Sequence, residues 1–251
     1  MNNILFACDI DNTLIYSKKH PHHGWPCVEW IHEKEQAFMS PKTCELLCEI
    51  VPHVLFVPVT SRSVEQYLRI QWPQGAMPHL AITTHGARLL TPCSEDALWQ
   101  DETQAHIAEW YIELHRMQKL LEPNPSFIRC RLVDEAYLFV YCAPGMDAVA
   151  MGDEIKAMTP LSVCVGGKKI YLLPPTLHKG TALQRLRQRF PQHTIIAAGD
   201  SNMDAEMLNE ADHAIFPEAI SPLVSTPGTC CPHDVLFSEF VVDTLQKILR
   251  S

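Results

Sequence analysis

Short apolar runs that end on polar residues alternate with helical patterns in the first 88 residues, and this alternation constrains the fold most strongly. The runs at 4–10, 53–59 and 80–83 predict buried strands. Two segments between them, 41–51 and 64–70, carry apolar residues at helical spacing, and a Ser-Pro pair marks the start of the first. This order predicts an α/β fold with a doubly wound parallel sheet.

The pattern changes after about residue 90. A single long helix is expected at 102–121, a strand pair at 127–142, a helix at 146–158 and a hairpin at 161–173. The strand and helix alternation then returns, with elements expected at 181–190, 194–198, 204–210, 214–216 and 235–249. We therefore predict a core formed by residues 1–88 and 174–251, interrupted by a smaller α+β module at 89–173.

Composition excludes several classes of protein. The 251 residues include 20 Lys and Arg against 29 Asp and Glu, a net charge of −9, which argues against a nucleic-acid partner. No apolar run is long enough for a membrane span, and the first residues do not resemble a signal peptide, so we expect a cytoplasmic protein. The ten scattered cysteines are expected to be buried, reduced thiols. The oligomeric state is not predicted.

Reactive side chains follow the predicted strands at the points where the strands end. Because the carboxyl ends of a doubly wound sheet form its binding crevice, these side chains are expected to meet there. Paired carboxylates can divide nucleophilic and proton-transfer roles, and further Asp residues can complete an oxygen site for Mg²⁺. A lysine and a threonine can bind an anion. The residues concerned are Asp9, Asp11, Thr13, Thr60, Lys179, Asp200 and Asp204.

These positions resemble the four motifs of the haloacid dehalogenase (HAD) superfamily. The segment Asp9-Ile10-Asp11-Asn12-Thr13 looks like the first motif, Thr60-Ser61-Arg62 the second, Lys179-Gly180 the third and Gly199-Asp200-Ser201-Asn202-Met203-Asp204 the fourth. The module between the second and third motifs resembles a type C2 cap. Ile82-Thr83-Thr84-His85-Gly86-Ala87 is similar to a segment of the Cof-type branch, which includes sugar phosphatases, with His85 in place of Asn.

The resemblance implies a Mg²⁺-dependent phosphatase that acts on a small phosphate ester, such as a sugar phosphate, through an aspartyl-phosphate. Asp9 would be the nucleophile and Asp11 the acid and base, with Thr60 and Lys179 assisting catalysis. The metal would be held by Asp9, the Asp11 carbonyl, Asp200 and Asp204. Substrate or phosphate contacts would come from Thr13, Thr60, Ser61, Arg62, His85, Lys179 and Asn202. Arg62 could instead form a surface salt bridge.

Two other functions remain open at this point. A phosphomutase would use the same nucleophile but return the phosphoryl group to its substrate, and a non-catalytic protein could bind a phosphate ligand on the same scaffold. The loop that contains His20, His22 and His23 could bind a metal or cover the site together with Trp25 and Trp30. The alternative is a packed hairpin anchored by the two tryptophans.

Overall fold

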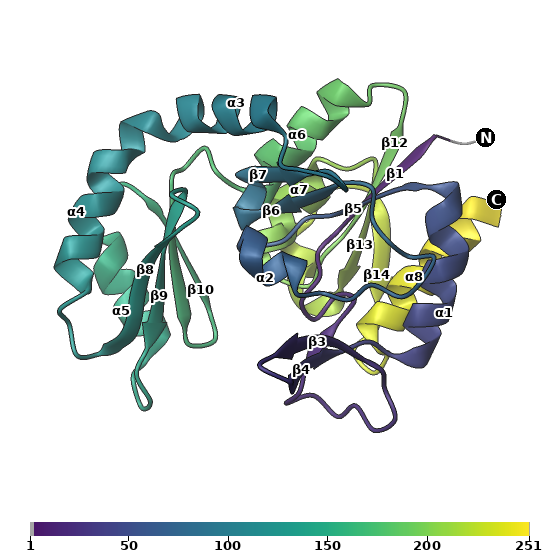
Figure 1. The fold of residues 1–251 in the computed structure, drawn as a ribbon, viewed down its shortest axis with the longest axis horizontal. Helices are drawn as coiled ribbons and strands as arrows, with labels where there is room; N and C mark the ends of the chain where they lie inside the picture. Colours follow the sequence, from purple (N-terminus) through teal and green to yellow (C-terminus); the bar gives the residue numbers. More distant parts are fainter. Residues whose placement is uncertain (1–2, 251) are drawn as a thin grey trace. The chain divides into compact units, whose positions relative to one another are not determined.

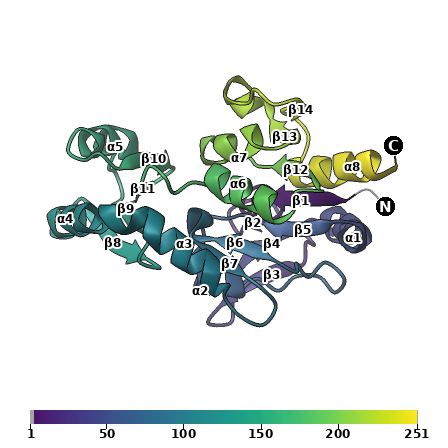
Figure 2. The same ribbon diagram turned by 90° about the horizontal axis from the view of Figure 1, so that it is seen from above.

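The computed structural model describes residues 3–250 and contains a central five-stranded parallel sheet (Figures 1 and 2). Its strand order is β14 (Gly228–Cys231), β13 (His213–Pro217), β12 (Thr194–Ala198), β1 (Ile4–Cys8) and β5 (Leu55–Pro58). Every residue of β1 is buried, as expected for a strand covered on both faces. The predicted doubly wound α/β fold is therefore confirmed.

Helices cover both faces of the parallel sheet. They are α1 (Pro41–Ile50), α2 (Val64–Leu68), α6 (Lys179–Arg189), α7 (Ala205–Asn209) and α8 (Phe237–Arg250). From β1 the chain moves outward through α1 to β5, and from β12 it moves the other way through α7 to β13. Right-handed crossovers in opposite directions place α1 and α7 on opposite faces. Figure 1 shows α8 beside α1.

The first helix starts where the sequence predicts. Ser40 adopts an extended conformation, and its hydroxyl accepts a hydrogen bond from the Thr43 backbone nitrogen at 3.1 Å. Pro41 occupies the first helical position, where its missing N–H has no intrahelical partner to lose. Residues Leu47 and Ile50 then pack into the core cluster beneath the sheet.

The third predicted strand takes part in the sheet only marginally. Residues Ala81–Thr83 (β6) pair in an antiparallel hairpin with β7 (Arg88–Leu90). Their link to the main sheet is a single parallel bridge between Val59 and Ile82. The turn between β6 and β7 brings Thr84 and His85 back towards the end of β5, which matters for the site described below.

A small three-stranded sheet follows the end of β1, with the order β2 (Tyr16–Ser17), β4 (Lys34–Phe38), β3 (Cys27–Ile31). It belongs to the same compact unit as the parallel sheet, which comprises residues 1–95 and 179–251. Single turns of 3₁₀ helix occur at Val51–His53, Thr84–Gly86, Ala108–Trp110 and Asn202–Asp204, with a longer one at Glu218–Leu223.

The second compact unit spans Asp96–His178. Its antiparallel sheet has the order β10 (Ser162–Gly166), β11 (Lys169–Leu173), β9 (Tyr137–Cys142), β8 (Phe127–Val133), and its helices are α3 (Ala97–Ile107), α4 (Tyr111–Leu121) and α5 (Ala148–Lys156). The unit lies later in the chain than the expected 89–173, because β7 and the bridge between Leu90 and Glu95 keep the residues up to 95 with the core.

The prediction of one helix over 102–121 is wrong. Asp96 caps a helix that begins at Ala97, and a 3₁₀ turn at Ala108–Trp110 separates it from α4. Each helix buries its own stripe, and the stripe of α4 (Leu114, Met117 and Leu121) packs on β8 and β9. A change of direction at the 3₁₀ turn lets the two stripes serve different surfaces, which a single helical period cannot reveal.

All ten cysteines are free, as predicted, but their burial varies. Cys8, Cys142 and Cys231 are buried, whereas Cys93 and Cys230 are exposed. Among residues 3–250, no helix combines the length and the apolar character needed to cross a lipid bilayer.

Candidate active site

The register of the parallel sheet brings the first and fourth motifs together. Strand β1 pairs with β12 so that Cys8 lies opposite Ala198, the last residue of each strand. The Asp9 backbone nitrogen donates to the Ala198 carbonyl at 2.9 Å. Asp9 and the loop that carries Asp200 therefore leave the sheet side by side, at the point where the chain reverses its direction of winding.

Asp204 reaches the same place through a tight turn. Its carboxylate accepts hydrogen bonds from the Ser201 backbone nitrogen at 3.0 Å and from the Ser201 hydroxyl at 2.8 Å. Gly199 makes the turn possible, because a Cβ atom there would lie 2.4 Å from the Cβ of Asp204. The fourth motif thus requires glycine for a packing reason at this position.

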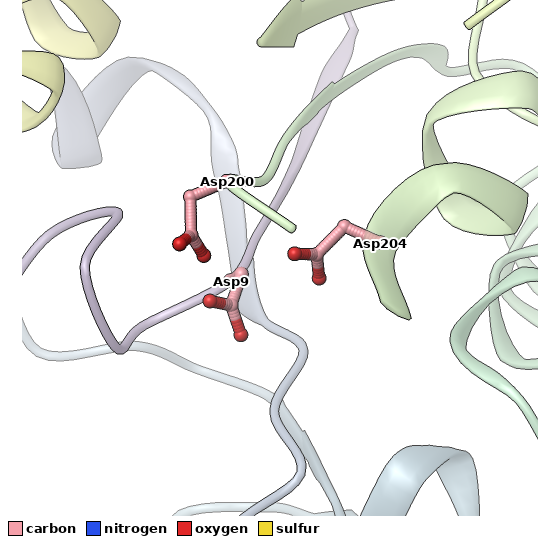
Figure 3. Close-up of side chains that lie close together, drawn as sticks. All are labelled: Asp9, Asp200 and Asp204. Atoms are coloured by element: carbon pink, nitrogen blue, oxygen red, sulfur yellow. The ribbon is translucent and has the colours of Figure 1, made fainter. Parts of the chain in front are cut away.

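Three carboxylates converge at the carboxyl end of the sheet (Figure 3). One oxygen from each of Asp9, Asp200 and Asp204 lies within 4.8 Å of the others. The Lys179 ammonium, at the start of α6, donates to Asp9 at 2.5 Å and to Asp204 at 2.6 Å. Asp9, Asp204 and Lys179 are all buried, so these charges interact with little screening.

The cluster carries more negative than positive charge. With all three carboxylates ionised and one ammonium, two negative charges are uncompensated. Burial raises the pKa of Asp9, with Lys179 opposing the rise and Asp204 and Asp200 adding to it. Burial and the neighbouring Asp204 raise the pKa of Asp200 to about 7. Although burial disfavours its charge, Lys179 has a raised pKa because of Asp204 and Asp9.

This donor set fits a divalent metal ion. Hard cations such as Mg²⁺ prefer carboxylate oxygens, and a charge of +2 balances the excess at the cluster. Asp9, Asp200 and Asp204 would hold the ion. The Asp11 carboxylate lies outside this group of oxygens, and a contribution of its backbone carbonyl to the metal stays a prediction.

Two threonines lie at the same strand ends. The Thr13 hydroxyl is 3.4 Å from Asp9 Oδ2 and 3.4 Å from Asp200 Oδ1, so it lies between two members of the cluster. Thr60 is fully buried after β5, and its hydroxyl accepts from the Arg62 backbone nitrogen at 3.2 Å. The turn into Thr13 places Asn12 in the left-handed region at φ 61°, which Asn tolerates better than most residues.

Arg62 forms a partly buried ion pair with Asp11. Its Nε and Nη2 donate to the two carboxylate oxygens of Asp11, each at 2.8 Å. Nη2 also donates to Glu29 at 3.0 Å. The Arg62 side chain is 11% exposed and that of Asp11 is 49% exposed, so the outer side of the Asp11 carboxylate stays accessible. Sequence reasoning missed Glu29, and no motif or spacing marks it.

The other predicted contact residues occupy the loops around these strand ends. His85 is buried, adopts φ 55°, and donates its backbone N–H to the Thr60 carbonyl at 3.1 Å. Burial and the nearby Lys179 lower the pKa of His85 to about 3, so its imidazole is neutral. Ser61 is half-buried beside Thr60, and Asn202 is exposed at the start of the 3₁₀ turn that leads to Asp204.

The histidine-rich loop packs against aromatic side chains of the small sheet. The His20 ring lies tilted against Tyr16 at a centroid distance of 4.4 Å and stacks on Trp25 at 5.6 Å, and His22 stacks on Phe38 at 3.7 Å. The described residues bring no group of three potential ligands together in this loop. The contacts of Trp25 agree with a packed hairpin, and a role of the loop in covering the site stays a prediction.

Comparison with known proteins supports the fold. No protein-family model matches the chain, and no curated protein matches it by sequence. Among solved structures, it is similar to the sucrose-phosphatase from Synechocystis sp. PCC6803, crystallised with sucrose and phosphate, with a TM-score of 0.68, 17% identity and 98% coverage of both chains.

Two trehalose-6-phosphate phosphatases also have similar structures. The C-terminal domain of the C. albicans enzyme gives a TM-score of 0.61 at 15% identity, covering 97% of this chain and 93% of the other. The Aspergillus fumigatus enzyme gives 0.56 at 15% identity, covering 100% and 94%. The chain thus shares its fold with these phosphatase structures.

Proposed function

We propose that this protein is a Mg²⁺-dependent phosphohydrolase that removes the phosphoryl group from a small phosphorylated metabolite through an aspartyl-phosphate. The observation that carries the proposal is the cluster of the buried Asp9 and Asp204 with the half-buried Asp200, in which Lys179 binds two of the members. Phosphoryl transfer depends mainly on positioning and charge stabilisation, and this cluster is built to supply both.

Asp9 is the proposed nucleophile. Its carboxylate attacks phosphorus, so that a bond forms from the carboxylate oxygen to phosphorus while the bond from phosphorus to the alcohol oxygen breaks. The contact with Lys179 at 2.5 Å orients the carboxylate and favours its ionised form. The Thr13 hydroxyl, near Asp9 Oδ2, restricts its rotation further.

Asp11 is the proposed acid and base. Asp11 enters the first step protonated and gives its proton to the departing alkoxide. The ionised Asp11 then takes a proton from a water whose oxygen bonds to phosphorus while the bond from phosphorus to Asp9 breaks, so both carboxyl groups return to their starting states. The half-exposed position of its side chain is compatible with both transfers. The buried hydroxyl of Thr60 is proposed to donate to an oxygen of the transferred phosphoryl group, whose charge Lys179 helps to offset.

The metal would be held by Asp9, Asp200 and Asp204 and would neutralise charge on the transferred group. Without such an ion, two uncompensated negative charges would repel an anionic substrate. A sugar phosphate is the substrate class we favour, because sucrose-phosphatase and the trehalose-6-phosphate phosphatases share the fold. Ten free thiols suit a reducing compartment, so we place the activity in the cytoplasm.

The test has two parts: a substitution of the proposed nucleophile, and a comparison of phosphate release with isomer exchange. Asp9→Asn should abolish Mg²⁺-dependent release of phosphate from p-nitrophenyl phosphate, because an amide is a very poor nucleophile. Asp243→Asn is the matched control, since Asp243 only pairs with Lys42 on the surface. Retained turnover in the Asp9 variant would overturn the assignment. Release of phosphate from a panel of sugar phosphates, without exchange between isomers, separates a phosphatase from a phosphomutase.

A further inference from the structure

A buried glutamate connects the small three-stranded sheet to the proposed acid and base. Glu29 lies in β3 and is only 4% exposed. One of its carboxylate oxygens accepts from Arg62 at 3.0 Å, and the other accepts from Arg69 at 3.1 Å. We propose that Glu29 is a positioning residue that orients Asp11 through Arg62. The inference rests on the proposed function, since it gives Asp11 a catalytic role.

The hydrogen bonds of Arg62 show why its orientation depends on Glu29. Nε and one N–H of Nη2 bind Asp11, and the other N–H of Nη2 is directed to Glu29. Nη1 donates to the Gln66 carbonyl at 3.3 Å. The guanidinium is planar and rigid. The hydrogen bond from Nη2 to Glu29 therefore also fixes the direction in which Nε and Nη2 donate to Asp11. Without Glu29, the Arg62 guanidinium would be held, apart from its bonds to Asp11, by the longer contact to the Gln66 carbonyl.

Glu29 is itself held by the backbone on either side. Residue 29 forms an isolated antiparallel bridge with Ile70, and the Gln71 N–H donates to the Val28 carbonyl at 2.8 Å. These bonds attach β3 to the segment that follows α2. These backbone bonds hold β3 in place, so the Glu29 side chain starts from a defined position.

The charges of this group balance, which explains how it tolerates burial. Asp11 and Glu29 carry two negative charges, and Arg62 and Arg69 carry two positive charges. Removing the charge of Glu29 leaves a guanidinium that is 11% exposed with one anionic partner instead of two. The Arg62 side chain can then turn towards other anions, including the phosphate of a substrate. Asp11, which is paired with Arg62, would then move away from the position in which it can protonate the leaving oxygen.

Misplacement of Asp11 has a specific chemical signature. The leaving group of an alkyl phosphate is an alkoxide that needs a proton. Its departure therefore breaks the O–H bond of protonated Asp11 as an O–H bond forms on the leaving oxygen. A p-nitrophenolate leaves without protonation. A defect in the acid therefore slows hydrolysis of the alkyl ester selectively, whereas general damage to the site slows both substrates alike.

The experiment compares kcat/KM for β-glycerophosphate and p-nitrophenyl phosphate in the wild type and in Glu29→Gln. We expect the ratio of the alkyl to the aryl value to fall about tenfold in Glu29→Gln, a fraction of what general acid catalysis supplies. Glu29→Asp keeps the charge on a shorter side chain and should recover part of the ratio. Glu65→Gln is the matched control, since Glu65 also pairs with Arg69 but is 82% exposed at its side chain.

The outcomes separate the two proposals. An active wild type with an unchanged ratio in Glu29→Gln, or with both values lowered equally, overturns the positioning role and leaves the proposed function standing. A wild type that hydrolyses neither ester overturns both. If Glu29→Gln is unfolded by circular dichroism, the ratio in Glu29→Asp decides, and an unchanged value there overturns the inference.

Discussion

Gly199→Ala offers the sharpest test of how the acidic cluster is built. The added Cβ would lie 2.4 Å from the Cβ of Asp204 and 2.6 Å from its carboxylate carbon, whereas ordinary contacts begin at 3.4 Å. Asp204 must therefore move by about 1 Å, and it is fully buried, so the surrounding structure must move with it. That displacement is large compared with the tolerance of a magnesium site.

Two measurements should change together in this variant. Overpacking is expected to lower the free energy of unfolding by about 1 to 3 kcal/mol, measured by urea denaturation without metal. The affinity for Mg²⁺, measured by isothermal titration calorimetry, should fall by about 10- to 100-fold because Asp204 no longer faces Asp9 and Asp200. Phosphatase activity should fall at least as much at a fixed, subsaturating Mg²⁺ concentration.

A second glycine supplies the control. In the other compact unit, a Cβ at Gly152 would lie 2.5 Å from Val165 Cγ2, a comparable overlap that involves no carboxylate. Gly152→Ala should therefore lose stability while its Mg²⁺ affinity stays unchanged. If Gly199→Ala also binds Mg²⁺ as tightly as the wild type, the role assigned to the turn around Gly199 is refuted.

Two further substitutions test the charges of the site. Lys179→Met should lower the stability of the metal-free protein by about 3 to 5 kcal/mol, since Asp9 and Asp204 lose their buried counter-charge. Added Mg²⁺ should raise its melting temperature more than that of the wild type, and equal increases would contradict the charge count. His85→Asn tests the pKa of about 3 at this position, against an ordinary value of 6.5. Above pH 6.5 the imidazole is neutral in the folded and unfolded states alike. As the pH falls below 6.5, the unfolded state binds a proton that the folded state excludes, so the wild type loses about 1.4 kcal/mol per pH unit. Urea unfolding at pH 7 and pH 5 should show about 2 kcal/mol less acid destabilisation in the variant than in the wild type, and the same loss in both would contradict the burial argument.

The positions of the motif residues could be predicted because they depend on local features. Asp9, Thr60 and Asp200 each come one or two residues after a strand, and parallel pairing of those strands places their ends side by side. The pairing of Cys8 with Ala198 brings Asp9 and Asp200 together in this way. No knowledge of distant side chains was needed for that step.

Glu29 could not be predicted because its role depends on partners distant in the chain. Arg62 and Arg69 follow it by 33 and 40 residues. A charged residue between Val28 and Trp30 has the pattern of a solvent-facing position in a strand, yet Glu29 is buried. The Asp11 carboxylate pairs with Arg62 and is not one of the three carboxylates that lie together beside Lys179.

Strand β14 shows the same limit at the level of secondary structure. Gly228–Cys231 lies between Pro227 and Pro232, a composition typical of a loop. It becomes a strand because it pairs with the edge of β13, where Gly228 lies opposite Ala214. A Cβ at Gly228 would lie 2.3 Å from the Ala214 carbonyl oxygen, so the pairing depends on glycine.

The position of β1 in the sheet has a consequence for how the protein is made. Its neighbours are β5 and β12, and β12 is formed by residues 194–198. One edge of the first strand therefore stays unpaired until most of the chain has emerged from the ribosome. The unit at Asp96–His178 is continuous and is completed before β12 emerges. During synthesis the nascent chain therefore carries a strand of apolar residues with one unpaired edge after the second unit is complete, which is the stage at which a chaperone is most useful.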